Sequence, residues 1–150
     1  MESNAHNING WHWSEKDFTE WATKTLKEKL VFEEPGSSPE TAFKTRIDEI
    51  RGEAFKNVRK GKLRTSYDFK VKLIATIGPD EGSDAPPVEC LVTYEPFCDS
   101  DPADWEFDVR VKDPAKHSAS KVAEAKKLIR REIFEKRVLE WIELYNQQMD

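Results

Sequence analysis

Residues 63–77 alternate between apolar and polar side chains over a longer stretch than any other part of the chain. The odd-numbered positions from Leu63 to Ile77 are mainly apolar, and the positions between them are mainly polar. A side-chain period of two is the period of a β-strand that has one face in a core and one face in water. We therefore expect a sheet with one apolar face.

Other segments predict further strands. An earlier strand begins at Phe43, and its alternation slips near Ile50 and Gly52, which predicts a β-bulge there. Residues 88–94 and 105–111 predict two later strands. The connection Arg59-Lys60-Gly61-Lys62 is short enough for a hairpin turn in which Gly61 adopts a positive φ. Short connections of this kind favour an antiparallel meander.

Two amphipathic segments flank these strands. Ser14 predicts the start of a first helix, with Asp17 in a capping-box position and apolar residues at helical spacing over 18–30. From about Ser118 onward the sequence predicts one long helix, whose apolar stripe covers residues 122–145. Because an apolar sheet face must be covered, we expect an α+β fold: an N-terminal helix, a four-stranded antiparallel β-meander and a long C-terminal helix packed on the sheet.

The size and charge of the chain exclude several classes of protein. A length of 150 residues suits one domain, and we expect a flexible N-terminal segment over 1–12 and a single α+β domain over 13–150. The net charge of -5 argues against a nucleic-acid binder, and no apolar run predicts a membrane span. The N-terminus has no export pattern, and Cys90 and Cys98 are too few for a disulfide framework. We therefore expect a cytoplasmic protein.

Charge is distributed unevenly along the chain. Residues 56–72 contain seven Lys or Arg residues against Asp68 alone, whereas residues 78–108 contain ten Asp or Glu residues and no Lys or Arg. One interpretation is that both are solvated surfaces that raise solubility. The other is a basic hairpin directed at an acidic or phosphate-bearing partner, with the acidic region rejecting wrong partners.

No pattern in the sequence is typical of a catalytic or metal site. His6, His12 and His117 share no metal-ligand spacing, and no Cys-x-x-Cys accompanies them. The glycine motifs that bind nucleotides and the Gly-x-Ser-x-Gly nucleophile motif do not occur. We therefore expect a protein without catalytic groups, metal or cofactor.

The segment Asn7-Ile8-Asn9-Gly10-Trp11-His12-Trp13 is the most unusual part of the sequence. Trp13 can form a hydrophobic staple with Phe18, but a staple does not explain the other residues. Together with Arg59-Lys60-Gly61-Lys62 and the preceding Gly52-Glu53, the segment resembles the N-terminal domain of the activators of the heat-shock protein 90 ATPase. That family carries Asn-x-Asn-Asn-Trp-His-Trp before its first helix and Arg-Lys-x-Lys in the turn after its first strand.

The resemblance runs over nearly the whole chain and implies a function. The family binds the middle domain of the chaperone, with its N-terminal segment near the nucleotide domain, and stimulates the ATPase by favouring the active conformation. The resemblance implies a monomeric co-chaperone. The residues that it implies for partner binding are Asn7, Asn9, Trp11, His12, Trp13, Glu53, Arg59, Lys60, Lys62 and Arg64.

Some features depart from the family pattern. Gly10 replaces the second of two adjacent Asn residues, and Arg64 and Ser66 occupy positions that are often aliphatic. The departures predict a more electrostatic docking surface. Family members often carry a second, C-terminal domain, so we expect either a short single-domain member or an isolated N-terminal domain.

The sequence leaves one alternative function open. A lipid or small-molecule carrier would need a cavity between the sheet and the helix over 122–145. The residues expected there, which include Ile129, Phe134, Trp141 and Tyr145, are large enough to fill that space.

Overall fold

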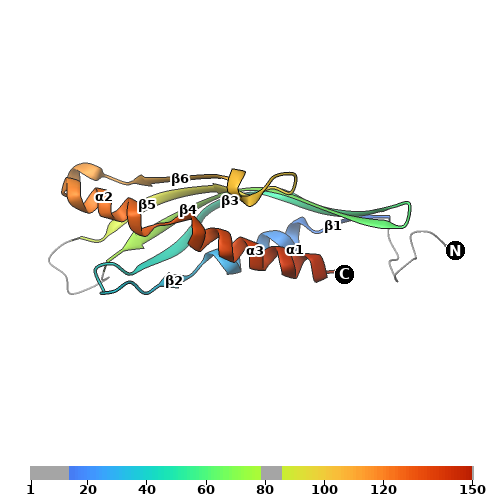
Figure 1. Cartoon of the computed structure of the whole chain (residues 1–150), viewed down its shortest axis with the longest axis horizontal. Coiled ribbons are helices and arrows are strands. Elements are labelled where there is room, and N and C mark those ends of the chain that lie inside the picture. The colour runs from blue at the N-terminus through green and yellow to red at the C-terminus, as the bar shows by residue number, and fades with distance from the viewer. Residues whose placement is uncertain (1–13, 79–85, 150) are drawn as a thin grey trace.

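A computed structural model describes residues 14–78 and 86–149 (Figure 1). The elements are, in chain order, β1 (Glu15–Asp17), α1 (Thr19–Leu30), β2 (Glu33–Glu34), β3 (Phe43–Arg59), β4 (Lys62–Ile77), β5 (Val88–Glu95), the 3-10 turn η2 (Pro102–Asp104), β6 (Glu106–Val111), the 3-10 turn η3 (Pro114–Lys116), α2 (Ala119–Leu128) and α3 (Arg131–Gln147). The predicted α+β class is confirmed. No helix in the described ranges is long and apolar enough to cross a membrane.

All strands pair antiparallel, in the order β1-β3-β4-β5-β6, and β2 also pairs with β3. The four long strands form the predicted meander. The two short strands β1 and β2 were not predicted, and both lie along the free edge of β3 near its opposite ends. They are three and two residues long, which is too short for an alternation pattern to show in the sequence.

The predicted start of the first helix at Ser14 is wrong. The carbonyl of Ser14 accepts a hydrogen bond from the Val58 N–H at 2.8 Å, and the Phe18 N–H donates to the Ala54 carbonyl at 2.8 Å. These bonds hold residues 15–17 against β3 as a strand. Helix α1 therefore begins at Thr19, whose N–H donates to the Asp17 carboxylate at 2.8 Å.

The helices cover one face of the sheet and leave the other face in water (Figure 1). Phe69, Val71 and Leu73 of β4 are at most 1% exposed on the covered face. Helices α1 and α3 lie side by side on it, and the Trp141 indole N–H donates to the Thr25 hydroxyl at 2.9 Å. A contiguous apolar core results between the two layers.

The C-terminal region forms two helices, which corrects the prediction of one long helix. Helix α2 ends at Leu128, and Ile129 and Arg130 leave helical geometry before α3 begins at Arg131. The break allows Ile129 to be only 2% exposed. It also places the Arg131 guanidinium so that it donates to the carbonyls of Pro102 and Trp105, where it holds the loop between β5 and β6.

The irregularity in β3 lies earlier than predicted. The register with β4 shifts between Ile47 and Glu49, and the strand is otherwise continuous. The slip in the sequence pattern at Gly52 has a different cause. A Cβ atom at Gly52, whose φ is +149°, would lie 2.1 Å from the Asp68 carbonyl oxygen, so only glycine allows β3 and β4 to approach there.

Candidate partner-binding site

The hairpin of β3 and β4 projects beyond the rest of the sheet as an arm (residues 54–67; Figure 1). Strand β5 pairs with β4 only over Val71–Ile77. Beyond it, an isolated bridge between Asp68 and Phe97 and a hydrogen bond of 3.0 Å from the Cys98 N–H to the Tyr67 carbonyl reach the base of the arm on that side. On the β3 side, β1 pairs with residues 55–57. The arm is therefore a narrow ribbon that holds its end away from the body of the molecule.

The turn at the end of the arm is the predicted two-residue hairpin turn. Arg59 lies opposite Lys62, which leaves Lys60 and Gly61 as the central residues. Their φ values are +53° and +77°, so both are left-handed, as in a type I′ turn. The prediction for Gly61 is confirmed. Lys60 is a non-glycine residue in a conformation that costs roughly 1–2 kcal/mol.

Strand geometry gathers the basic side chains of the arm on one face. Arg59 lies opposite Lys62, and Arg64 follows Lys62 by two residues on the same strand, so all three face away from the helices. All three are exposed, and so is Lys60 at the turn. We refer to Arg59, Lys60, Lys62 and Arg64 as the tip cluster.

Within the described ranges, no member of the tip cluster forms a salt bridge. Like charges directly opposite each other on a sheet are destabilising, and Arg59 and Lys62 form such a pair. The arm therefore carries a concentration of positive charge that the described fold does not neutralise. Such a site attracts carboxylate or phosphate groups.

Other basic residues counted in the sequence do not belong to this cluster. Lys70 lies 3.9 Å from Glu95, and Lys72 lies 3.7 Å from Glu49. The acidic region is likewise partly neutralised, because Glu89 lies within 4 Å of both Arg46 and Lys112. Among the basic residues of 56–72, those that are exposed and form no salt bridge within the described ranges thus lie at the end of the arm.

Lys56, at the base of the arm, is fully buried. Its Nζ donates to the carbonyls of Tyr145 and Gln148 at the C-terminal end of α3. It also lies 4.7 Å from the ring centroid of Tyr145 and 5.2 Å from that of Phe18. Burial lowers the pKa of Lys56 to about 8. Sequence reasoning treated Lys56 as a surface charge and missed this structural role, although its spacing from the apolar Ala54 indicated the inner face.

Tyr145 makes a second connection between α3 and the arm. Its hydroxyl donates to the Ser66 carbonyl at 3.0 Å, and the Ser66 hydroxyl donates to the Phe55 carbonyl across the hairpin at 3.2 Å. Burial raises the pKa of the Tyr145 hydroxyl, so it stays protonated and able to donate. The end of α3 therefore fixes the direction in which the arm projects.

The remaining predicted site residues lie in two places. Glu53 is exposed on the same face as Arg59, opposite Asp68, and about 20 Å from Arg59 along the strand. It is therefore separate from the tip cluster. The residues predicted in the N-terminal motif lie outside the described residues: Asn7, Asn9, Trp11, His12 and Trp13. Ser14, where the described chain begins, is hydrogen-bonded to Val58 near the end of the arm.

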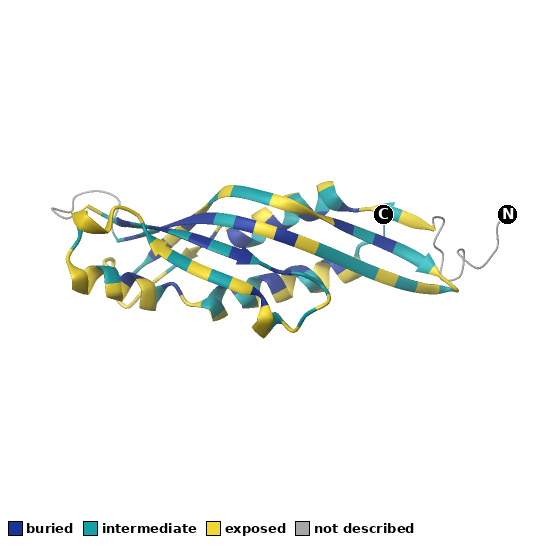
Figure 2. Ribbon diagram, turned by 90° about the horizontal axis from the view of Figure 1, so that it is seen from above, coloured by how far each residue is buried: buried dark blue, intermediate teal, exposed yellow. Residues whose placement is uncertain are grey.

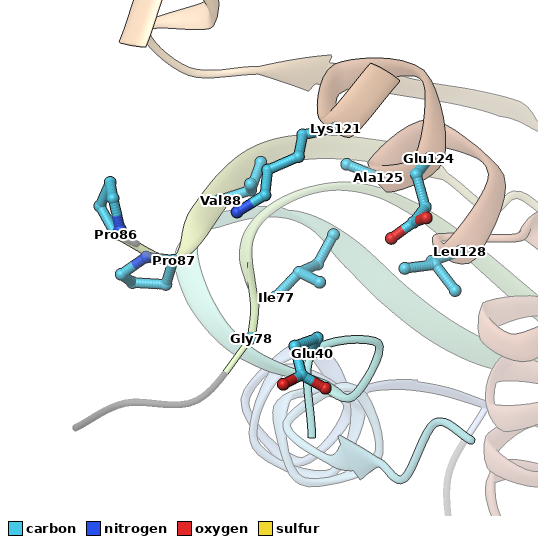
Figure 3. A pocket seen from close by; sticks show the side chains of 10 residues that line it. All are labelled: Glu40, Ile77, Gly78, Pro86, Pro87, Val88, Lys121, Glu124, Ala125 and Leu128. Carbon is cyan, nitrogen blue, oxygen red and sulfur yellow. The ribbon is translucent and has the colours of Figure 1, made fainter. Parts of the chain in front are cut away.

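Little space exists for a bound small molecule between the sheet and the C-terminal helices. Ile129, Phe134, Trp141 and Tyr145 are each at most 2% exposed and fill the layer that the carrier alternative requires. A pocket of about 120 Å³ lies between Ile77 and the helix α2 (Figure 3). Small-molecule sites typically measure about 300–1,000 Å³, so this pocket does not support the carrier alternative. In the described ranges, no group of three His, Cys, Asp or Glu residues is placed to hold a metal ion.

Comparison with known proteins identifies the family. Residues 15–149 match the family model for the N-terminal domain of the activator of Hsp90 ATPase. The Hsp90 co-chaperone AHA1 of Saccharomyces cerevisiae is 30% identical over 135 residues, which cover 87% of this chain and 37% of the yeast protein. The human activator of 90 kDa heat shock protein ATPase homolog 1 is 37% identical over 71 residues, or 47% of this chain and 21% of the human protein.

A solved structure supports the fold. The crystal structure of Aha-1 from Plasmodium falciparum superimposes with a TM-score of 0.65 at 16% identity, and the match covers 89% of this chain and 88% of that one. The chain spans only 37% of the length of the yeast relative and 21% of the human one. The chain belongs to the activator of Hsp90 ATPase family and corresponds to the N-terminal domain of its members.

Proposed function

We propose that this chain is a co-chaperone domain that binds the middle domain of Hsp90 through the tip cluster and stimulates the Hsp90 ATPase. The observation that supports this most directly is the position of Arg59, Lys60, Lys62 and Arg64. They are exposed at the end of a projecting arm and form no salt bridge within the described ranges. Family membership supplies the partner.

The proposed mechanism is selective binding of one chaperone conformation. A ligand shifts a conformational equilibrium only by its difference in affinity for the two states. A tenfold shift toward the active conformation needs about 1.4 kcal/mol of such a difference. In this mechanism the tip cluster docks on carboxylates of the middle domain, and contacts that the N-terminal motif makes only in the active conformation supply a difference of this size. Arg59 suits a two-pronged contact with a carboxylate, whereas Lys60 and Lys62 act as point charges.

Replacing three members of the tip cluster tests the proposal. The variant Arg59→Ala, Lys60→Ala, Lys62→Ala should bind purified Hsp90 roughly 10- to 100-fold more weakly at low ionic strength, because each exposed contact contributes about 0.5–1 kcal/mol. The loss should shrink as salt is added. Binding is measured by titration calorimetry, and stimulation by ATP turnover of Hsp90 with and without the chain.

A matched control removes the same charge elsewhere. Lys121, Lys126 and Lys127 are exposed on α2, at the other end of the molecule from the arm (Figure 1). Replacing these three with Ala should leave both affinity and stimulation near the wild-type values. Equal weakening by the two triple variants, or wild-type affinity of the arm variant at low salt, would rule out the tip cluster as the docking site.

A further inference from the structure

The edge strand β6 presents backbone N–H and C=O groups that form no hydrogen bond to another described strand. It ends the strand order, and Figure 1 shows it along the rim of the sheet. The Lys112 N–H donates to the Glu89 carbonyl at 2.8 Å, which makes these opposing residues a hydrogen-bonded pair. Such pairs alternate along an antiparallel ladder, so the N–H and C=O groups of Phe107, Val109 and Val111 point away from β5.

The side chains of β6 add two further features. Phe107, Val109 and Val111 face the helices but are only partly buried, whereas the inner-face residues of the neighbouring β5 are buried (Figure 2). On the opposite face every side chain is charged and exposed, in the order Glu106, Asp108, Arg110 and Lys112. Native edge strands commonly carry charges that repel another strand. Here the charges are two negative followed by two positive. Two copies of the strand placed antiparallel therefore bring opposite charges together.

We propose that β6 pairs antiparallel with β6 of a second copy of this chain, about a two-fold axis at Val109. In this register Val109 lies opposite its own copy and Phe107 lies opposite Val111, so the unused backbone groups face one another. Glu106 then lies opposite Lys112, and Asp108 lies opposite Arg110. A register centred on Asp108 or on Arg110 would place a like charge against itself, so the charge order selects Val109 as the centre.

The expected dimer is weak and reversible. The contact is limited to the seven residues from Glu106 to Lys112, and Asp108 and Arg110 already interact within one chain at 3.2 Å. Exposed ion pairs contribute little, and small interfaces belong to transient complexes. We expect a dissociation constant on the order of 10⁻⁴ M. This inference differs from the monomer expected from the sequence. It does not depend on the proposed function, because the arm takes no part in the contact.

Sedimentation velocity of the whole chain over rising concentration tests the proposal. We expect the weight-average sedimentation coefficient to rise toward the dimer value, and Val109→Pro to abolish the rise. Proline fits this position because the Val109 N–H points away from β5 and is not needed for the existing ladder. The matched variant Val109→Thr retains the N–H and should still associate. Circular dichroism verifies that each variant is folded.

Charge variants provide a second test that does not depend on proline. Asp108→Arg places an arginine opposite each Arg110 in the dimer and should weaken association. Adding Arg110→Asp to that variant restores opposite charges in the same register and should restore association. A wild-type chain that stays monomeric up to about 10⁻³ M overturns the proposal. So does association that all these variants leave unchanged, because the contact would then lie on another surface.

Discussion

At the scale of single residues, Lys56 links the arm to the body of the molecule. Its ammonium group is buried and donates to the carbonyls of Tyr145 and Gln148 at the end of α3, where helix carbonyls commonly take partners from outside the helix. A cation is also favoured by the helix dipole at this end. The sequence pattern identified the strand that carries Lys56. It did not predict a lysine in the core, because which helix end meets that strand depends on tertiary packing.

Replacing Lys56 should destabilise the fold. We expect Lys56→Met to lower the free energy of unfolding by about 1.5–3 kcal/mol, the usual contribution of hydrogen bonds to a charged group. Lys62→Met removes the same charge from an exposed position and should change it by less than about 0.5 kcal/mol. Urea unfolding followed by tryptophan fluorescence measures both. Equal stabilities for the two variants would show that the buried contacts of Lys56 add nothing.

The lowered pKa of Lys56 predicts a pH dependence of stability. Its pKa is about 8 in the folded chain, whereas the ordinary lysine pKa of 10.5 applies to the unfolded chain. At pH values between 8 and 10.5 the unfolded state therefore binds more protons than the folded state. The contribution of Lys56 to the free energy of unfolding therefore rises as pH increases from 8 to 10.5. Burial raises the pKa of Cys90 to about 11, which acts in the opposite direction above pH 9.

The comparison with Lys56→Met isolates the lysine, because both proteins retain Cys90. The free energy of unfolding of the wild type minus that of the variant should increase by up to about 1.4 kcal/mol per pH unit in this window. Urea unfolding at a series of pH values measures the difference. A difference that stays constant, or that falls, from pH 8 to 10 contradicts a lowered pKa.

At the scale of elements, the sequence predicted what depends on local pattern. The alternation of Leu63–Ile77 predicted β4, and the short connection that contains Gly61 predicted the turn. The structure has both. The strand β1 and the break at Ile129 were missed for a shared reason. Each depends on contacts with distant residues, β3 in the first case and the core in the second, and local propensity carries little information about such contacts.

The turn of the arm shows a conflict between stability and charge. Lys60 is left-handed, a conformation that asparagine adopts more easily, and Asn-Gly is the preferred pair for this turn. Lys60→Asn should therefore leave the free energy of unfolding unchanged or raise it by up to about 1 kcal/mol. Because it removes one charge from the tip cluster, the same variant should bind Hsp90 about three- to fivefold more weakly at low salt.

Thermal unfolding and binding titrations together test this separation. Lys60→Arg is the matched variant that retains the charge and should keep wild-type affinity. If Lys60→Asn binds as well as wild type, the charge of Lys60 has no part in docking. If it instead loses stability, the lysine has a structural partner, and loss of binding would not then report on charge.

At the scale of the whole molecule, the described chain begins beside the arm. Ser14 is held against Val58 near the tip cluster, so the chain enters the described fold beside the proposed docking site. Periodicity and composition alone predicted the sheet, the helices and a basic hairpin. They did not predict the family, because a charged surface specifies a class of ligand and no particular protein. The two family motifs predicted it, and the proposal of Hsp90 as the partner comes from the family.

This arrangement predicts that affinity and stimulation can be separated. Deletion of residues 2–11 removes Asn7, Asn9 and Trp11 and leaves the strand β1 and the tip cluster unchanged. We expect the shortened chain to keep its affinity for Hsp90 within about threefold and to lose most of its stimulation of ATP turnover, because the arm supplies docking and the motif acts after docking. Affinity and stimulation that fall by the same factor would mean that the motif belongs to the docking surface itself. The variant Arg59→Ala, Lys60→Ala, Lys62→Ala is the complementary control, since saturating amounts of it should still stimulate.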